Sequence, residues 1–206
     1  MKNLKSILIT LFVFAAYASG ICSGATITVG PGLGYDFTSI QAAIDDADNG
    51  DEIVVSPGTY YEAIDFLGKA VHLYSTDGPE VTILDGTGDY HVVQCVSGEG
   101  PDTILEGFTV TGGNAFNGGG MINSISSPTV NHCIFTENFA SNGGGGMYNF
   151  SSSPTVRNCV FIDNATDAFG GGLLNNSNSN TILINCTFTR NSGPFGSGIV
   201  NFMNSH

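Results

Sequence analysis

Apolar residues occur in short runs separated by glycine, asparagine, serine and proline along most of the chain. This pattern is typical of short strands joined by tight turns. In the second half the pattern repeats: glycine-rich triplets begin at Gly118, Gly144, Gly170 and Gly196, 26 residues apart, and each leads into an apolar pair and an asparagine. A repeat of this length holds three short strands and three turns. The period therefore predicts an all-β fold in which each repeat forms one coil of a parallel β-helix.

Stacked coils would place the same position of successive repeats in one column, about 4.8 Å apart. We expect one column of phenylalanines stacked inside the coils, one of asparagines that hydrogen-bond to one another, and one of buried cysteines. The cysteines are expected to be reduced, because side chains on adjacent parallel strands are further apart than a disulfide prefers. The predicted structural ladder comprises Phe135, Phe161, Phe188, Asn138, Asn164, Asn191, Cys133, Cys159 and Cys186.

The segment before residue 107 predicts the start of the same coil. An apolar face over residues 40–47, with Thr38 and Gln41 as a capping box, indicates a short helix that ends at Asn49-Gly50. We expect this helix to cover the first coil and protect its open sheet edge. The predicted strands in this segment are residues 53–55, 63–66, 71–74, 81–84, 92–96 and 103–110.

The chain divides into three parts. Residues 1–25 combine a basic start, a short apolar run and small residues, which is typical of a secretory signal peptide. Residues 26–106 are expected to form the cap and the first coils, and residues 107–206 the 26-residue repeats. The last copy stops where earlier copies begin another strand, so we expect a chain truncated at its C-terminus. We predict an exported protein, secreted or on the cell surface or outer membrane, without a transmembrane segment in its mature part.

Charge narrows the choice of partners. The chain has 5 Lys and Arg against 18 Asp and Glu, a net charge of −13, which argues against a nucleic-acid partner. Fifteen acids lie between residues 26 and 106, opposed only by Lys69. Such a surface repels polyuronates unless divalent cations bridge them. We expect no cofactor. The densest acidic cluster is the one candidate calcium site, with a solvated helix end as the alternative: Asp45, Asp46, Asp48, Asp51 and Glu52.

Two stretches resemble known families. Residues 36–67, from Asp-Phe-Thr-Ser-Ile to Phe-Leu, are similar to the entry segment of pectin-lyase-like right-handed parallel β-helix proteins. Residues 103–206 resemble the repeats of bacterial polymorphic outer-membrane proteins, whose Phe-x-x-Asn element matches residues 135–138, 161–164 and 188–191. The resemblance implies the fold. It does not fix an activity, because the superfamily includes lyases, hydrolases, esterases and surface proteins.

No catalytic constellation of these families can be placed on the chain, so no catalytic residue and no metal ligand is predicted. The candidate binding residues are Glu137 and Asp163, which share a repeat position, and Phe139 and Phe169, which could form stacking platforms for sugars. The alternatives are solvent-facing turn residues for the two acids and corner packing for the two phenylalanines. Histidine spacing does not indicate zinc.

The even repeats favour a non-catalytic exported protein, either a structural or adhesive shaft or a carbohydrate-binding segment. Its partners would be polysaccharides or cell-surface glycans. The alternative is the N-terminal part of a polysaccharide lyase or glycoside hydrolase whose catalytic coils are missing from this sequence.

Overall fold

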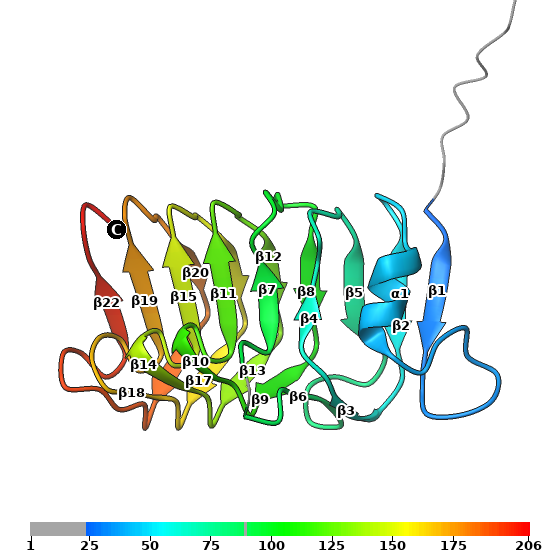
Figure 1. The fold of residues 1–206 in the computed structure, drawn as a ribbon, viewed down its shortest axis with the longest axis horizontal. Coiled ribbons are helices and arrows are strands. Elements are labelled where there is room, and N and C mark those ends of the chain that lie inside the picture. Colours follow the sequence, from blue (N-terminus) through cyan, green and yellow to red (C-terminus); the bar gives the residue numbers. More distant parts are fainter. Residues whose placement is uncertain (1–23, 89) are drawn as a thin grey trace, which may run out of the picture.

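The computed structural model describes residues 24–88 and 90–206 and consists of short parallel strands stacked in coils. Figure 1 shows the strands side by side along the long axis, with the only helix of the described residues beside β1. The first sheet contains β1 Thr26–Val29, β2 Glu52–Val55, β5 His72–Ser75, β8 Ile104–Glu106, β12 Thr129–Asn131, β16 Thr155–Arg157 and β20 Ile182–Ile184. The second contains β3 Gly58–Tyr61, β6 Thr82–Asp85, β9 Thr109–Thr111, β13 Ile134–Thr136, β17 Val160–Ile162 and β21 Thr187–Thr189.

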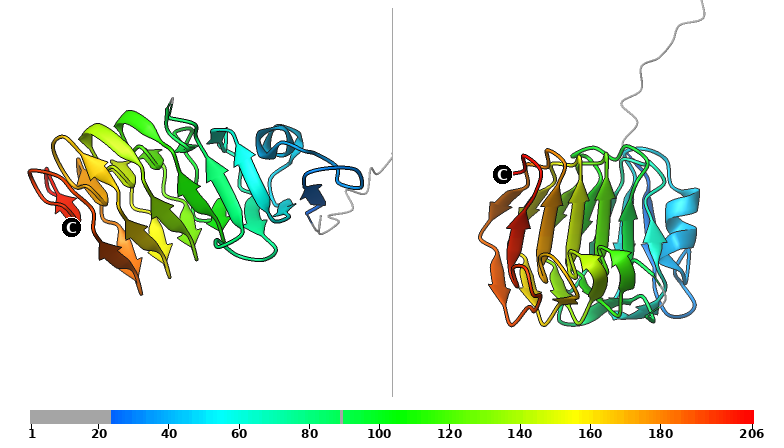
Figure 2. Two further views of the ribbon diagram at one scale, coloured as in Figure 1. Left: turned by 90° about the horizontal axis from the view of Figure 1, so that it is seen from below. Right: turned by 60° about the vertical axis from the view of Figure 1, so that its left-hand side comes forward.

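The third sheet closes each coil. It contains β4 Ile64–Asp65, β7 Val93–Cys95, β11 Met121–Ser124, β15 Met147–Phe150, β19 Leu173–Asn176 and β22 Ile199–Asn201. A small fourth sheet between the second and the third contains β10 Asn114–Asn117, β14 Phe139–Gly143 and β18 Ala165–Thr166. The coils follow one another in chain order (Figure 2). The predicted all-β parallel β-helix is therefore confirmed.

The strand predictions before residue 107 need two corrections. Residues 103–110 form two strands, β8 and β9, because Gly107 adopts a φ of 78° and turns the chain between two sheets. Strands β1 and β3 were not predicted, although each has the same length as the predicted β2. The predicted signal peptide, residues 1–25, lies outside the described residues except for its last two positions.

Helix α1, Ile40–Asp46, buries its apolar face against the first coils. The expected Thr38 capping box is wrong: Ser39 is the N-cap, and its hydroxyl accepts from the amide of Ala42 at 3.2 Å. The carboxylate of Glu62 takes the place of a capping-box acid, accepting from the amides of Ile40 at 2.7 Å and Gln41 at 3.0 Å. A negative charge there complements the positive end of the helix dipole.

The other end of α1 is held by Lys69. The ammonium group donates to the carbonyl oxygens of Ile44, Asp45 and Ala47 at 2.7 to 2.8 Å. These carbonyls have no partner within the helix, and a cation stabilises the negative end of its dipole. The helix therefore ends at Asp46, before the predicted stop at Asn49-Gly50.

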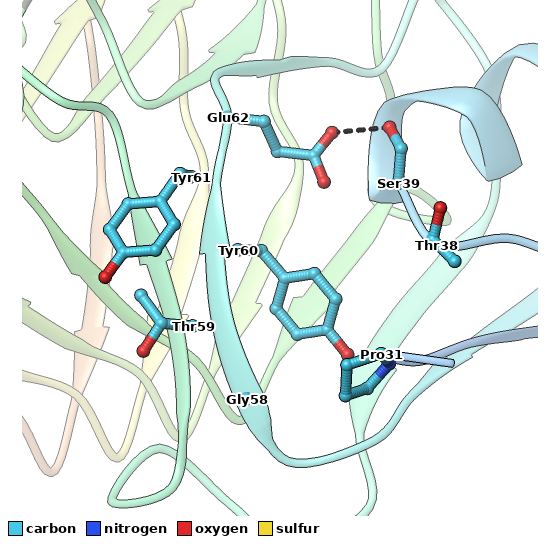
Figure 3. Close-up of a pocket in the computed structure, with 8 residues that line it drawn as sticks. All are labelled: Pro31, Thr38, Ser39, Gly58, Thr59, Tyr60, Tyr61 and Glu62. Atoms are coloured by element: carbon cyan, nitrogen blue, oxygen red, sulfur yellow. Dashed lines mark hydrogen bonds between the residues drawn. The ribbon is translucent and has the colours of Figure 1, made fainter.

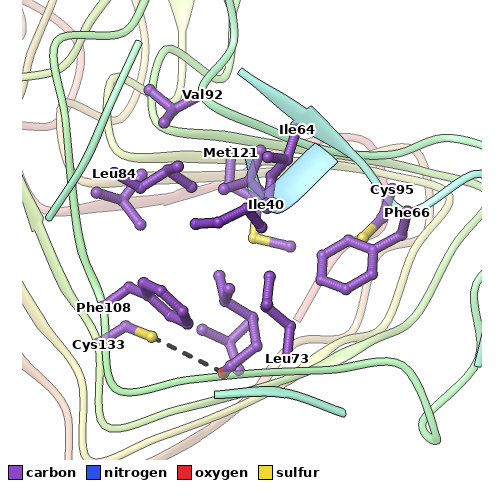
Figure 4. Close-up of a cluster of buried hydrophobic side chains, with 14 of the residues drawn as sticks. Ile40, Ile64, Phe66, Leu73, Leu84, Val92, Cys95, Phe108, Met121 and Cys133 are labelled. Carbon is purple, nitrogen blue, oxygen red and sulfur yellow. Dashed lines mark hydrogen bonds between the residues drawn. The ribbon is translucent and has the colours of Figure 1, made fainter. Parts of the chain in front are cut away.

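The interior of the coils is a continuous apolar column. Figure 4 shows Ile40 of the helix among buried side chains of the early coils, including Phe66 and Phe108. Further along, the rings of Phe135 and Phe161 stack at 4.8 Å, and those of Phe161 and Phe188 at 4.6 Å. The register pairs the same residues, so each ring fills the same position of its coil.

Two buried asparagine columns run beside the phenylalanines. Asn138 and Asn164 donate through Nδ2 to the next asparagine of their column at 3.0 Å. The second column is Asn123, Asn149, Asn175 and Asn201, with Nδ2 to Oδ1 distances of 2.8 to 2.9 Å. Its first member, Asn123, pairs in register with Cys95, whose side chain has no amide group. Oδ1 of Asn123 therefore has no donor among the described residues.

A column of serines begins at a buried carboxylate. The amides of Ser126, Ser152 and Ser179 each donate to the serine hydroxyl of the next coil at 3.1 Å. At the start of the column, Glu99, only 2% exposed, accepts from the Ser126 hydroxyl at 2.7 Å and from the amides of Gly68 and Ser97 at 2.8 Å. Three donors satisfy this carboxylate, which explains how a charged group is buried at this corner.

The glycine triplets permit close approach between coils. A Cβ on Gly146 would lie 2.6 Å from the carbonyl oxygen of Gly172 and 2.9 Å from the ring of Phe161. Distances this short do not occur between a methyl group and backbone atoms without a shift of the chain. Glycine at this phase of the repeat is therefore required by packing between coils.

His91 makes the stability of the fold sensitive to mild acid. The ring is 6% exposed, and its Nδ1 lies 2.8 Å from the carbonyl oxygen of Gly118. Burial lowers the pKa of His91 below the ordinary value of 6.5, so below that pH the unfolded chain binds a proton that the folded chain resists. The free energy of unfolding should therefore fall as pH drops from about 7.5 to about 5.5, above the range where carboxylates titrate.

Urea titrations of His91→Gln at the two pH values test this prediction. We expect the variant to lose less stability than the parent on acidification, whereas His132→Gln, at an exposed histidine, should lose as much as the parent. An equal loss in the parent and in His91→Gln would contradict the assignment.

Candidate functional site

Two hollows mark the surface of the early coils. The first, with a volume of about 330 Å³, lies where the cap meets the second sheet and is lined by Pro31, Thr38, Ser39, Gly58, Thr59, Tyr60, Tyr61 and Glu62 (Figure 3). Three of its polar side chains, Ser39, Tyr60 and Glu62, already have structural partners. The carboxylate of Glu62 caps α1 and accepts from the Ser39 hydroxyl at 2.7 Å, and the hydroxyl of Tyr60 donates to the carbonyl of Ser56 at 2.8 Å. This hollow therefore offers little chemistry to a ligand.

Four polar side chains gather on the outer face of the first sheet, and we call them the His72 cluster: Glu52, His72, Tyr74 and Glu106. They point outward because Ile53, Leu73 and Leu105, which alternate with them along β2, β5 and β8, are buried in the core. The register places Glu52 beside His72 and Tyr74 beside Glu106.

The side chains of the cluster contact one another. His72 Nε2 lies 3.1 Å from Glu106 Oε2, and both side chains are about one-third exposed, at 31% and 36%. The rings of His72 and Tyr74 lie 4.7 Å apart with planes tilted by 36°. Burial raises the pKa of Tyr74, and the neighbouring Glu52 carboxylate adds to the increase, so the phenol stays protonated at neutral pH.

The second hollow, of about 370 Å³, opens directly beside this cluster. It is lined by Asn49, Gly50, Asp51, Glu52, Ala70, His72 and Asp102. The carboxylate of Asp51 is engaged, since it accepts from the amides of Ala25 at 2.6 Å and Asp48 at 2.8 Å. The side chains of Glu52 and Asp102 are exposed, and they leave the hollow with acidic walls. The ring of His72 and the carboxylates of Asp51, Glu52 and Asp102 therefore meet at one concave surface.

The predicted pair Glu137 and Asp163 occupies one column at the end of the second sheet. Both adopt a left-handed backbone, with φ of 55° and 57°, as does Arg190 one coil further on. Arg190 donates to both carboxylate oxygens of Asp163, at 2.8 and 2.6 Å, and this hydrogen bonding lowers the pKa of Asp163. Asp163 is therefore already paired, and Glu137 lies one coil before it.

The predicted stacking residues Phe139 and Phe169 do not lie in the same column. Phe139 pairs in register with Asn114 and Ala165, whereas Phe169 pairs with Gly143 and Phe195. The structure instead groups Phe169 with two exposed rings, Phe195 at 5.1 Å and Phe202 at 5.7 Å between ring centroids. Within the described coils, Phe169 is therefore the one predicted stacking residue that lies in a group of neighbouring aromatic rings.

The predicted ladder residues line the inside of the coils and do not face a ligand. Asn138 and Asn164 are at most 1% exposed. The thiols of Cys133, Cys159 and Cys186 are free and lie 3.0 to 3.4 Å from backbone carbonyl oxygens of their own coils. The exposed asparagine column is a different one, in which Asn158 and Asn185 donate to the preceding asparagine at 3.0 and 2.8 Å.

The acidic cluster proposed for calcium is divided among different partners. Asp51 holds two backbone amides, and Asp45 accepts from the side chain of Gln41 at 2.9 Å. Among residues 24–88 and 90–206, no three His, Cys, Asp or Glu side chains are arranged to hold a metal ion. In the same residues no helix has the length and apolar character of a membrane span.

The sequence carried only part of the signal for the His72 cluster. Strand alternation in residues 71–74 and 103–110 would place His72, Tyr74 and Glu106 on outer faces. It could not show that these faces adjoin, because the early coils differ in length and have no period from which to derive the register.

The family is shown by comparison with known proteins. The profile described as "Right handed beta helix region" matches residues 70–206. No curated protein matches the chain. Among solved structures, a pectin methylesterase from carrot is similar, with 13% identity and a TM-score of 0.49 over 78% of this chain, and the match covers 64% of the carrot protein. The resemblance to polymorphic outer-membrane proteins stays a prediction. Since the profile spans well over half of the sequence, this chain belongs to the right-handed β-helix family.

Proposed function

We propose that this protein is a non-catalytic, exported β-helix that binds a glycan at the His72 cluster and the hollow beside it. The observation that carries the proposal is the arrangement of two adjacent rings, His72 and Tyr74, between the carboxylates of Glu52 and Glu106 at the edge of a concave surface. Aromatic faces pack against the apolar faces of sugar rings, and carboxylates accept hydrogen bonds from sugar hydroxyls.

An open sheet face favours binding over turnover. Hydrolysis of a glycosidic bond needs one carboxyl group as acid and a second as base or nucleophile, in a site that excludes bulk water. In the cluster, Glu106 is paired with His72, and the cluster side chains remain partly exposed to water on the outer face of the first sheet. The predicted signal peptide supports an extracellular setting, where polysaccharides are accessible.

Replacing Tyr74 with alanine should weaken glycan binding about tenfold. Loss of one stacking ring costs up to about 1.5 kcal/mol, and 1.4 kcal/mol corresponds to a factor of ten. Titration calorimetry with neutral, anionic and cationic oligosaccharides would identify the ligand, and the same samples assayed for new reducing ends or unsaturated products would report turnover.

The matched control is Tyr61→Ala. Tyr61 is a tyrosine 71% exposed on the neighbouring second sheet, so it offers the same side chain outside the cluster. Equal weakening by both substitutions, or binding that neither affects, would show that the glycan does not bind at the cluster. Product formation by the parent would reject the non-catalytic role and favour the alternative, a lyase or hydrolase.

A further inference from the structure

We infer that the ligand of the His72 cluster is an amino-sugar polymer with free, positively charged amino groups. This inference rests on the proposed glycan-binding function and adds the chemical class of the sugar. It follows from three observations: acidic side chains surround the rings, the nearest cation is engaged elsewhere, and two carboxylates lie on opposite sides of the rings.

The acidic groups around the rings belong to different strands and turns. Glu52 and Asp102 line the hollow beside His72, and Glu106 lies on the far side of the ring. Tyr74, which pairs in register with Glu106, adds a phenol hydroxyl between the acids. A uronate chain would bring more carboxylates to this surface and be repelled, whereas protonated amines would be attracted.

No basic side chain of the described early coils neutralises these acids. Lys69 is the only Lys or Arg in residues 24–106, and its ammonium group donates to three carbonyls at the end of α1. The next cation is Arg157, in the same outward column as Glu106 but two strands away, roughly 10 Å. His72 is therefore the only basic side chain in the cluster, and among the acids it contacts only Glu106.

The two carboxylates are spaced to contact different sugars. Glu52 and Glu106 lie two strands apart, roughly 10 Å, and two residues apart along the strand direction, roughly 7 Å. The rings of His72 and Tyr74 lie between them. A sugar polymer that crosses the sheet obliquely can place one sugar on the rings. The amino groups of the preceding and following sugars then lie beside the two carboxylates.

Three probes of equal length test the inference: β-1,4-linked glucosamine oligomers, their fully N-acetylated forms, and galacturonate oligomers. By titration calorimetry at low salt we expect the glucosamine oligomers to bind at least tenfold more tightly than the acetylated ones, and the galacturonates not to bind. High salt should weaken only the glucosamine complex. Glu52→Gln and Glu106→Gln should each weaken it about fivefold, without affecting the acetylated oligomers.

Asp167→Asn is the control, since it removes an exposed acid from a distant coil. Equal weakening by Asp167→Asn and the cluster variants would reduce the effect to overall charge and overturn the inference. If acetylated oligomers bind as tightly as glucosamine and still depend on Tyr74, the inference fails and the glycan-binding function stands. If no oligosaccharide of any charge depends on Tyr74, the proposed function itself fails. Melting curves of each variant confirm that these surface substitutions leave the fold intact.

Discussion

Phe161→Ala is expected to lower the free energy of unfolding by about 4 kcal/mol. The ring is fully buried and lies between two others, with Phe135 at 4.8 Å and Phe188 at 4.6 Å. Removing it leaves a cavity that the backbone cannot close, because the strand register on both sides fixes the spacing between coils. The substitution also removes the aromatic contacts of both neighbours, which adds to the lost burial.

Urea titration followed by circular dichroism measures this effect, with Phe116→Ala as the control. Phe116 is 69% exposed, so the same change of side chain should cost less than about 1 kcal/mol there. Similar losses for the two variants would mean that Phe161 does not contribute to a packed column. Because stacked coils contact mainly their neighbours, the loss is expected to be greatest in the coils around residue 161.

Asn164→Ala is expected to cost a similar amount, about 4 kcal/mol, for a different reason. Oδ1 of Asn164 accepts from the backbone amide of Asn138 at 3.2 Å and from its Nδ2 at 3.0 Å. Its own Nδ2 donates to the carbonyl of Phe135 at 2.9 Å. Alanine would leave these backbone groups without partners in a site that water does not reach, and each such group costs about 1–3 kcal/mol.

Hydrogen exchange separates this explanation from a simple packing loss. The amide of Asn138 should exchange much faster in Asn164→Ala, while amides of the early coils keep their protection. Asn131→Ala is the control, since Asn131 is only half-buried and water can replace its side-chain bond to the exposed Asn158. A loss below 1 kcal/mol in Asn164→Ala, or unchanged exchange at Asn138, would contradict the role given to the buried column.

The repeat allowed the second half of the fold to be predicted in detail. A period of 26 residues, with one extra residue in the last copy, places Phe135, Phe161 and Phe188 at one phase of the coil, and the structure stacks them in register. The same logic placed Glu137 and Asp163 together. It did not predict the ion pair between Arg190, at the same phase, and Asp163, because a shared repeat position does not fix whether two long side chains contact each other.

In the first half, local patterns predicted elements but not their partners. The apolar face of residues 40–47 indicated a helix, and the helix exists as Ile40–Asp46. Its capping by Glu62 and Lys69 was not visible in the sequence, because Glu62 is 22 positions from its partner Ile40 and Lys69 is 25 positions from its partner Ile44. The structural role of Glu99 could not be predicted for the same reason. Its carboxylate accepts from amides of two turns and from the first hydroxyl of the serine column.

The sequence by itself determined the architecture of this protein: short strands, a repeat that stacks on itself, and a core of identical residues in columns. A repeat does this because every copy meets the next in the same register, so one period fixes all contacts between coils. Only the tertiary structure decided the candidate site. His72 and Glu106 are 34 residues apart in coils of unequal length, and their contact depends on a register that no periodic pattern encodes.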